Sequence, residues 1–563
     1  MLAVPHESAI GYHLAPMTRR LPPAAILAFL TAGPAVAQTD ETAAPSLDPA
    51  WLESRNATIR EIRFEIGDVF DLSNPEEDKR LYRFANRIHI RSKQSTLESI
   101  LLSHEGDAFD ARLNDETARA LRARGFISEA TVTPSDYDER TNSVALQVST
   151  QDSWSLDPEL KFSRGGGENE YAFGISEENL FGLGKEVTLT RSRDIDRTET
   201  FFEYADGNVR GSRTRFGVIL TDTSDGHRRE LAVGRPFYAL DSRWAIETAF
   251  KDTDRVDSMY GFGEVIDEFS HEIDSFSLWG GWSRGMRDNR TFRWLTGITS
   301  DEHRFSDYAD FGDPLLLPDD RKLVYPWFGI QVAEDDFRQM RELNDMGRTE
   351  DVALGLQFSM QLGYAAQEYG SDRDAAILHA SAHKGWEPGG TGNLFLVDLQ
   401  AQARREGGQT RNSILTSTFR YYRRTFGRHL MTARLSTTIG NRLDAENQVL
   451  LGGDSDLRGY PLRYQSGEGS AVLTLEQRFF TDKYIWRLLR VGWAVFADVG
   501  RVWGADARGV ENLGTLYDVG IGLRFTSPRA SSHAVIHIDL AFPINAPADV
   551  DSVQLSIEKK SSF

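Results

Sequence analysis

The sequence predicts an all-β transmembrane barrel of about 16 antiparallel strands, preceded by a small N-terminal α+β domain. Two observations lead to this fold class. Short runs of alternating apolar and polar residues recur through residues 155–563, between turns rich in Gly, Asp and Asn. The chain also opens with the pattern of an export signal, and no later run of 18 or more apolar residues could form a membrane-spanning helix. If such an exported chain crosses a bilayer, its strands must close into a barrel.

The composition excludes several kinds of site. The chain has 563 residues, a formal net charge of −20 and a pI near 5.2, which disfavours nucleic acid as a partner because phosphate binding needs clustered Lys and Arg. It contains no Cys, so disulfides, thiolate metal sites and a cysteine nucleophile are excluded. His271 and Glu272 lack the second His of a zinc-protease helix. We expect no enzyme activity, no cofactor and no metal site.

Residues 1–37 show the three-part pattern of a secretory signal peptide. Two arginines precede a short apolar run, and the stretch from Ala35 to Ala37 forms a cleavage site, so Met17 is the expected true start. The alternative, a short buried helix, fits poorly with the three prolines of this stretch. Residues 38–50 then form a polar leader or linker.

Residues 51–152 are expected to form one small domain of mixed α and β structure. An alternating run over Ile59–Ile66 predicts its first strand. Two helices follow, of which the second is strongly amphipathic and ends at Gly125. Two further strands within residues 127–150 complete the order β-α-α-β-β. The acidic residues 67–87 are expected to form a solvated loop in this domain, and we assign them no function.

Residues 155–563 are expected to form the barrel. The run from Val491 to Val499 illustrates the pattern, since its odd-numbered residues are apolar and Asp498 lies on the opposite face. Spanning strands of 9–11 residues, with one face toward lipid and one toward a polar lumen, produce this alternation. Aromatic residues such as Trp486 fit the girdles at the edges of such a barrel.

The length of residues 155–563 gives an estimate of the strand number and bears on the alternative architecture, a soluble β-sandwich. Allowing about 25 residues for each strand with its connection gives about 16 strands. A soluble β-sandwich would show the same alternation. Over so long a region it would need domain boundaries, and no linker is evident within residues 155–563.

Two short motifs and the terminal residue carry a family resemblance. They are Leu457, Arg458, Gly459 and Tyr460, then Phe496, Asp498 and Gly500 on a later strand, and Phe563. In this combination the sequence resembles the BamA/TamA-type outer-membrane surface antigen superfamily, which includes the two-partner secretion transporters. The resemblance covers nearly the whole mature chain. It implies that residues 51–152 are a single POTRA domain and that Phe563 is the C-terminal barrel signal.

The resemblance also implies a site inside the barrel. In that superfamily the arginine of the loop motif folds back into the lumen and pairs with the acid of the strand motif, here Arg458 and Asp498. The alternation independently points Asp498 inward, and it points Glu476 inward as a candidate second acceptor. The alternative is that Arg458 ends an ordinary extracellular turn and that Asp498 merely lines the lumen.

The function implied by the resemblance is assembly, insertion or translocation of other proteins at the outer membrane of a Gram-negative bacterium, with the POTRA domain in the periplasm. Alternatives are two-partner-type secretion of one dedicated exported protein, and a passive porin or surface antigen. Expected partners are the lipid bilayer with lipopolysaccharide, unfolded or exported clients at the POTRA domain, and accessory periplasmic or lipoprotein factors. Clients would leave through a weak seam between strands near Leu156–Phe162 and Val553–Phe563.

Overall fold

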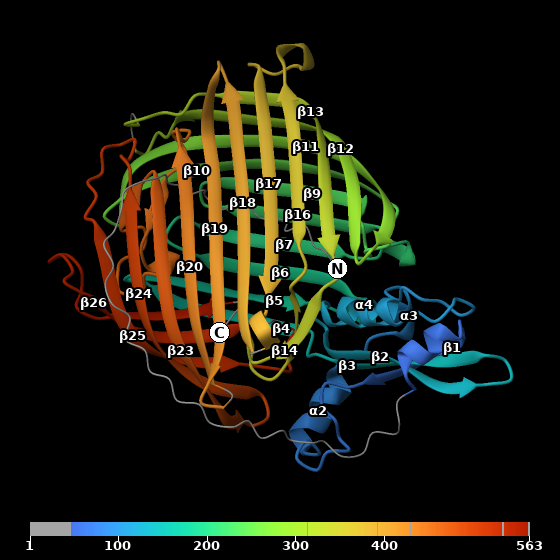
Figure 1. The fold of residues 1–563 in the computed structure, drawn as a ribbon. Coiled ribbons are helices and arrows are strands. Elements are labelled where there is room, and N and C mark those ends of the chain that lie inside the picture. The colour runs from blue at the N-terminus through green and yellow to red at the C-terminus, as the bar shows by residue number, and fades with distance from the viewer. Residues whose placement is uncertain (1–46, 312–313, 391, 428, 532–533, 561–563) are drawn as a thin grey trace.

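The protein consists of a large β-barrel and a small N-terminal domain that lies across one end of it (Figure 1). The structure is a computed structural model that describes residues 47–563, apart from 312–313, 391, 428, 532–533 and 561–563. The expected signal peptide, residues 1–37, most of the leader and the terminal Phe563 lie outside the described residues. Within the described part, no helix is both long and apolar enough to cross a membrane.

The barrel is a closed antiparallel sheet of 20 strands. The prediction of about 16 strands is wrong, because a strand with its connection takes about 20 residues rather than 25. Several connections are two-residue turns, such as Gly166–Gly167 and Gly407–Gly408, where both residues have positive φ angles and therefore favour glycine. The strands are β4 (Leu156–Gly165), β5 (Glu168–Glu177), β6 (Lys185–Arg193), β7 (Thr198–Asp206), β8 (Arg215–Thr223), β9 (Gly226–Arg235), β10 (Trp244–Gly261), β11 (Glu264–Arg287), β12 (Arg290–Asp307), β13 (Arg321–Glu334), β16 (Gln357–Ala365), β17 (Ala375–Trp386), β18 (Asn393–Glu406), β19 (Gln409–Thr425), β20 (His429–Asn441), β23 (Gly469–Ile485), β24 (Leu489–Trp503), β25 (Thr515–Thr526), β26 (Val535–Ile544) and β27 (Gln554–Lys560).

The alternating pattern separates an apolar outer face from a polar inner face. On β25, Val519, Ile521 and Leu523 are 41%, 47% and 46% exposed, whereas Arg524 is fully buried inside. Large exposed apolar side chains occur on other strands around the barrel, including Phe173, Leu189, Leu220, Phe250, Leu278, Trp294, Phe328, Leu362, Phe419, Leu475 and Leu540. So much apolar surface is unfavourable in water and suits contact with lipid.

The N-terminal domain is a three-stranded sheet covered by helices. Its strands lie in the order β1-β3-β2, with β3 in the middle, parallel to β1 and antiparallel to β2. Leu52, Leu97 and Leu121 from three helices are fully buried in its core. The strands are β1 (Thr58–Gly67), β2 (Ile127–Asp138) and β3 (Ser143–Asp152), and the helices are α1 (Pro49–Ser54), α2 (Arg80–Ile88), α3 (Gln94–Glu98) and α4 (Ala111–Arg122).

The expectation that residues 67–87 form only a solvated loop is wrong, because the last eight residues of this segment belong to α2. Leu81, Phe84 and Ile88 have the i, i+3, i+7 spacing of one helix face, a pattern that the acidic residues of the segment obscured. The domain therefore has two helices more than the predicted β-α-α-β-β order, namely α1 and α2.

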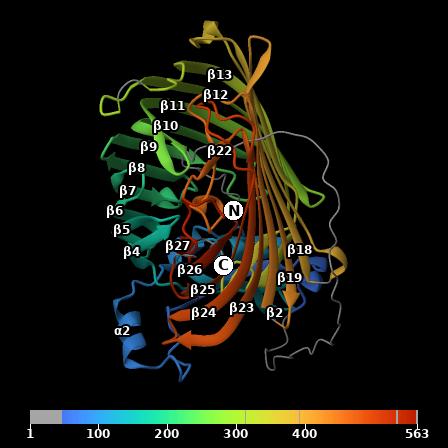
Figure 2. The ribbon, with the colours of Figure 1, turned by 90° about the vertical axis from the view of Figure 1, so that its left-hand side faces the viewer.

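Two connections between barrel strands carry short hairpins. The hairpin of β14 (Phe337–Arg341) and β15 (Thr349–Ala353) lies between β13 and β16, at the end of the barrel where the N-terminal domain sits (Figure 1). The hairpin of β21 (Val449–Leu451) and β22 (Gln465–Gly467) lies between β20 and β23, inside the barrel walls (Figure 2). Single 3-10 turns occur at Leu180–Gly182, Val209–Gly211, Gln367–Tyr369, Pro388–Gly390 and Gly453–Ser455.

Candidate functional site in the barrel lumen

The predicted loop motif lies inside the barrel, on the connection between β20 and β23. Leu457 and Tyr460 are fully buried and belong to one apolar cluster with Leu451 and Val502. The Tyr460 hydroxyl also donates a hydrogen bond to the carbonyl oxygen of Tyr517, at 3.3 Å. The connection therefore folds into the lumen instead of forming an ordinary exposed turn.

Arg458 contacts the acid of the strand motif directly. Its Nε and Nη2 atoms donate hydrogen bonds to the two carboxylate oxygens of Asp498, at 2.8 and 3.0 Å. Its Nη1 atom lies 3.2 Å from Glu476 and 3.3 Å from Asp539. The guanidinium carbon lies 3.3 Å from the ring centroid of Phe496. Arg458 is 5% exposed, so these charges meet out of contact with bulk water.

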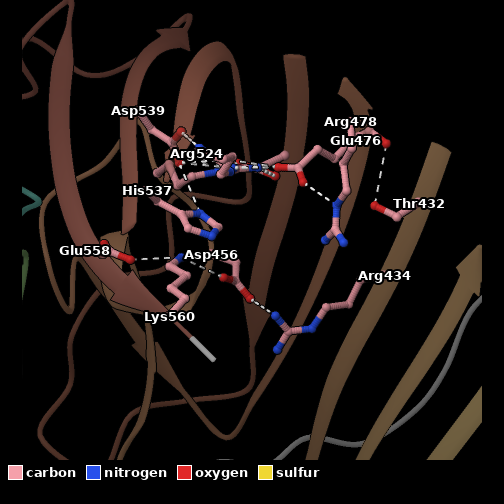
Figure 3. Close-up of polar contacts among 12 residues, drawn as sticks. Thr432, Arg434, Asp456, Glu476, Arg478, Arg524, His537, Asp539, Glu558 and Lys560 are labelled. Atoms are coloured by element: carbon pink, nitrogen blue, oxygen red, sulfur yellow. Dashed lines mark hydrogen bonds and ion pairs between the residues drawn. The ribbon is translucent and has the colours of Figure 1, made fainter. Parts of the chain in front are cut away.

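The pair belongs to a larger buried ion network, part of which Figure 3 shows. Glu476 accepts hydrogen bonds from Arg478 at 2.8 Å and from Arg524 at 3.1 Å, and Arg524 also pairs with Asp539. The network contains three cations and three carboxylates, so its charges balance. Buried ionic groups need such pairing, because an unpaired buried charge is costly. The members are Arg458, Arg478, Arg524, Glu476, Asp498 and Asp539.

Two glycines of the motifs allow the loop to approach the wall closely. A Cβ atom on Gly459 would lie 2.6 Å from the Cβ atom of Asp518, and the Gly459 N–H donates a hydrogen bond to that carboxylate at 3.0 Å. A Cβ atom on Gly500 would lie 3.2 Å from side-chain atoms of Leu451 and Leu457. Both motif glycines thus lie where a side chain would push the loop off the wall.

The seam between the first and last barrel strands is thin. Among the described residues, β4 and β27 share a single pair of Cα partners, Arg164 with Ile557. Every other neighbouring pair of barrel strands shares at least seven such partners. Fewer main-chain pairs hold this junction than any other in the described wall, so less free energy opposes its opening.

The inner loop bridges this seam. Asp456 lies 3.5 Å from Lys560 of β27 and 2.6 Å from Arg434 of β20 (Figure 3). On the other side of the seam, Leu462 packs on the β4–β5 turn so closely that a Cβ atom on Gly166 would lie 2.1 Å from the Leu462 nitrogen. The loop that Arg458 holds therefore contacts the structure on both sides of the thin junction.

A second connection enters the lumen from the opposite end. Leu343 and Met346, between β14 and β15, are buried against Phe480 of the barrel wall. Arg478 donates a hydrogen bond to the Leu343 carbonyl at 2.8 Å, which links this connection to the ion network. In the same segment, Arg348 donates to the carbonyl oxygens of Ile127 and Ala530 at 3.1 and 2.9 Å.

Helix α4 fastens the N-terminal domain to the barrel. Arg119 pairs with Asp335 at 2.6 Å and Arg122 pairs with Asp351 at 2.7 Å, and both acids lie on the connection between β13 and β16. Arg112 pairs with Asp241 after β9, and Glu116 accepts a hydrogen bond from the Leu240 N–H at 2.7 Å. Sequence analysis missed these contacts, because the same residues would suit a solvated helix face.

Solved structures similar to this chain include the following three. BamA from Haemophilus ducreyi lacking POTRA domains 1–3 is 14% identical with a TM-score of 0.37, over 89% of this chain and 84% of that chain. CdiB from Acinetobacter baumannii is 11% identical with a TM-score of 0.46, over 89% and 74%. CdiB from Escherichia coli is 12% identical with a TM-score of 0.44, over 90% and 76%. No family model and no curated protein matches the sequence. The resemblance to the BamA/TamA-type superfamily rests on the loop and strand motifs, which the structure brings into contact.

Other residues weighed in the sequence lie in ordinary structural positions. Residues 281–285 match the Gly-x-Ser-x-Gly pattern of a nucleophile elbow. The elbow requires a strand-to-helix turn, whereas Ser283 lies within β11 and donates a hydrogen bond to the Phe292 carbonyl at 2.9 Å. His271 accepts or donates hydrogen bonds with Asp257 and His303 on the lumen wall. Over the residues that the structure describes, no group of three or more His, Cys, Asp or Glu side chains could hold a metal ion.

Replacing Glu116 with glutamine is expected to alter the pH dependence of stability. Burial raises the pKa of Glu116 above its ordinary value. A buried carboxyl with a raised pKa destabilises the fold while it is ionised, and this penalty fades as the pH falls through that pKa. The melting temperature of Glu116→Gln relative to wild type should therefore be higher at pH 8 than at pH 5.

Calorimetry of the full chain in detergent measures this difference. Glu98→Gln, at an exposed position of the same domain, is the control for the loss of one carboxylate charge. A Glu116→Gln difference that is the same at pH 8 and pH 5 would contradict the assignment.

Proposed function

We propose that this protein is an outer-membrane barrel that inserts or translocates other proteins, with a periplasmic POTRA domain and no enzymatic activity. The observation that carries the proposal is the thin seam between β4 and β27, because an opened seam offers strand edges to an incoming polypeptide. The motif resemblance supports the same role.

The outer surface and the N-terminal domain support the location. Exposed apolar side chains on the barrel strands suit lipid contact, and the domain at one end would then lie in the periplasm. β1 and β2 are the edge strands of its sheet. An edge strand can pair with an unfolded client through main-chain hydrogen bonds, which need no particular client sequence. Accessory periplasmic or lipoprotein factors would join the same domain.

The lumen favours protein handling over passive diffusion. The Arg458 loop occupies it from one side, and the connection holding Leu343 enters it from the other. A porin needs an open aqueous channel, whereas two infolded connections pack against the inner wall of this barrel. Clients would therefore leave sideways through the seam into lipid.

A reversible cross-link across the seam tests the proposal. The chain has no Cys, so Arg164→Cys with Ile557→Cys creates a single disulfide at the β4–β27 register pair. The purified protein in liposomes should speed the folding of urea-unfolded outer-membrane barrels, measured by protease protection. The oxidised variant should lose this acceleration and regain it on reduction. Leu523→Cys with Ile538→Cys, a register pair between β25 and β26, is the matched control and should keep its activity.

Two results would change the proposal. If the oxidised seam variant works as well as wild type, lateral exit is wrong. If wild type folds clients no faster than empty liposomes, general insertion is wrong, and secretion of one dedicated exported protein takes its place. In that case, deletion of the protein should remove one secreted product and leave the other barrels intact.

A further inference from the structure

We propose that helix α2 lies in the headgroup region of the periplasmic leaflet and binds anionic lipid there. The inference rests on the membrane location proposed above and adds a lipid contact outside the barrel wall. It assigns a role to α2, most of which lies in residues 67–87, the segment to which sequence analysis assigned no function.

The apolar face of α2 has no cover within the protein. Leu81, Phe84 and Ile88 are 57%, 58% and 52% exposed, and their spacing puts them on one side of the helix. Ile90 and Leu72, on either side of the helix in sequence, are also exposed. Contiguous large apolar side chains on a surface mark a contact with another molecule or with lipid.

The other side of α2 is anchored to the protein. Tyr82 is 3% exposed, and its ring stacks on Phe70 with centroids 4.6 Å apart. Asn86 accepts a hydrogen bond from the Phe70 N–H and donates one to the Phe70 carbonyl, at 3.1 and 2.8 Å. These contacts fix the rotation of the helix about its axis. The Tyr82 and Asn86 contacts thus hold the apolar side chains on the side of the helix that faces away from the domain.

The acids just before α2 have cationic partners. Glu76 pairs with Arg487 and Glu77 pairs with Arg529 at 2.7 Å, both on barrel connections, and Asp78 pairs with Arg83 of the helix. Arg80 and Arg87 are exposed, and neither has a hydrogen-bond or ion-pair partner in the part of the chain that the structure describes. Free cations beside an apolar face are the composition of a helix that lies on an anionic membrane surface.

The position of α2 continues the lipid-facing surface of the barrel. The Tyr82 hydroxyl donates a hydrogen bond to the Trp486 carbonyl at 2.7 Å, which places α2 beside the β23–β24 turn, as both ribbon views show (Figures 1 and 2). Trp486 is 76% exposed, and Ile485 and Leu489 beside it are 40% and 36% exposed. An exposed Trp at the end of barrel strands suits the membrane interface. Lipid is therefore the partner that suits both the apolar face of α2 and the exposed β23–β24 turn.

Single-cysteine reporters test the inference in the full chain, because wild type has no Cys. Phe84→Cys would carry an environment-sensitive fluorophore, with the protein in nanodiscs of phosphatidylcholine and phosphatidylglycerol. Ile521→Cys on the outer face of β25 reports the bilayer, and His104→Cys reports the solvated surface of the N-terminal domain. Nitroxide-labelled lipid should quench the label at position 84 several-fold more strongly than the label at 104. Aqueous iodide should show the reverse order.

The outcomes separate this inference from the proposed location. If position 521 is quenched by nitroxide lipid but position 84 behaves like 104, the helix does not bind lipid, and the barrel location stands. If 521 is not quenched either, the membrane location itself is wrong. If position 84 is shielded from iodide without nitroxide quenching, a protein covers the helix and the inference is overturned.

A charge variant tests the lipid class. Arg80→Glu with Arg87→Glu, in the labelled Phe84→Cys background, should reduce nitroxide quenching at least twofold in nanodiscs that contain phosphatidylglycerol. In pure phosphatidylcholine the same variant should change the quenching little. Equal quenching of both proteins in the anionic nanodiscs would overturn the preference for anionic lipid.

Discussion

Replacing Arg458 with alanine is expected to destabilise the barrel by about 3–5 kcal/mol, because it removes the shared cation from three buried carboxylates. Asp498 is fully buried and takes two of the hydrogen bonds of Arg458, and Glu476 and Asp539 take the others. Arg524 and Arg478 remain but cannot reach all the vacated oxygens in the present geometry. The midpoint of urea unfolding in detergent measures the loss, and protease cleavage within residues 442–468 measures release of the loop.

Arg434→Ala is the matched control for this variant. Arg434 pairs with Asp456 of the same loop at 2.6 Å, but its side chain is 47% exposed, so its loss should change stability by less than about 1 kcal/mol. Asp498→Asn in the Arg458→Ala background should recover part of the lost stability, since it removes one unpaired buried charge. Equal effects of Arg458→Ala and Arg434→Ala would show that the buried network does not hold the loop.

The same contacts show which part of the site was predictable from sequence. Alternation along a strand is a local property, so the pattern around Val491–Val499 was enough to point Asp498 inward. Glu476 followed from the same rule on its own strand. The partners Arg524 and Asp539 also alternate inward, but their convergence on Glu476 depends on how β23 to β26 are staggered, which no single strand encodes.

The number of strands and the docking of the N-terminal domain were harder to predict from the sequence. The number of strands depends on the length of the connections between them. Two-residue glycine turns make several connections shorter than the length assumed for the prediction. The arginines of α4 match the pattern of a solvated helix end, although Arg119 and Arg122 pair with acids of the β13–β16 connection. The sequence alone does not distinguish a solvated charge on a helix from a charge that pairs across an interface, because the partner is known only from the structure.

A chain of contacts links the docked N-terminal domain to the thin seam between β4 and β27. Arg478, Glu476 and Arg458 tie the connection at Leu343 to the loop at Asp456. The same connection pairs with helix α4 of the N-terminal domain. Movement of the N-terminal domain would therefore alter the support of the seam without any contact between that domain and β27. Coupling of this kind requires a bistable element, and the seam is the weakest junction of the described wall.

Replacing Arg348 with alanine is expected to release the N-terminal domain from the barrel. Arg348 is 3% exposed and donates hydrogen bonds to the carbonyl oxygens of Ile127 and Ala530 and to the Ser153 hydroxyl, at 3.1, 2.9 and 3.2 Å. Arg348 thereby joins the N-terminal domain, the linker between β3 and β4, and the connection between β25 and β26. Loss of these charged donors should weaken docking by about 3 kcal/mol, which raises the undocked population about 100-fold.

Protease cleavage of the linker near Ser153 measures this population in the full chain, because the linker is buried while the domain is docked. Arg338→Ala is the control on the same hairpin, since the Arg338 side chain is 60% exposed and lies 3.7 Å from the carboxylate of Glu387. Cleavage of this control should match wild type. If Arg348→Ala is cleaved no faster than Arg338→Ala, the α4 ion pairs alone hold the domain, and Arg119→Ala with Arg122→Ala should then release it. If docking supports the seam through the ion network, Arg348→Ala should also slow oxidation of the Arg164→Cys and Ile557→Cys pair, because the two thiols separate when the seam loosens. Oxidation at the wild-type rate would show that docking does not support the seam.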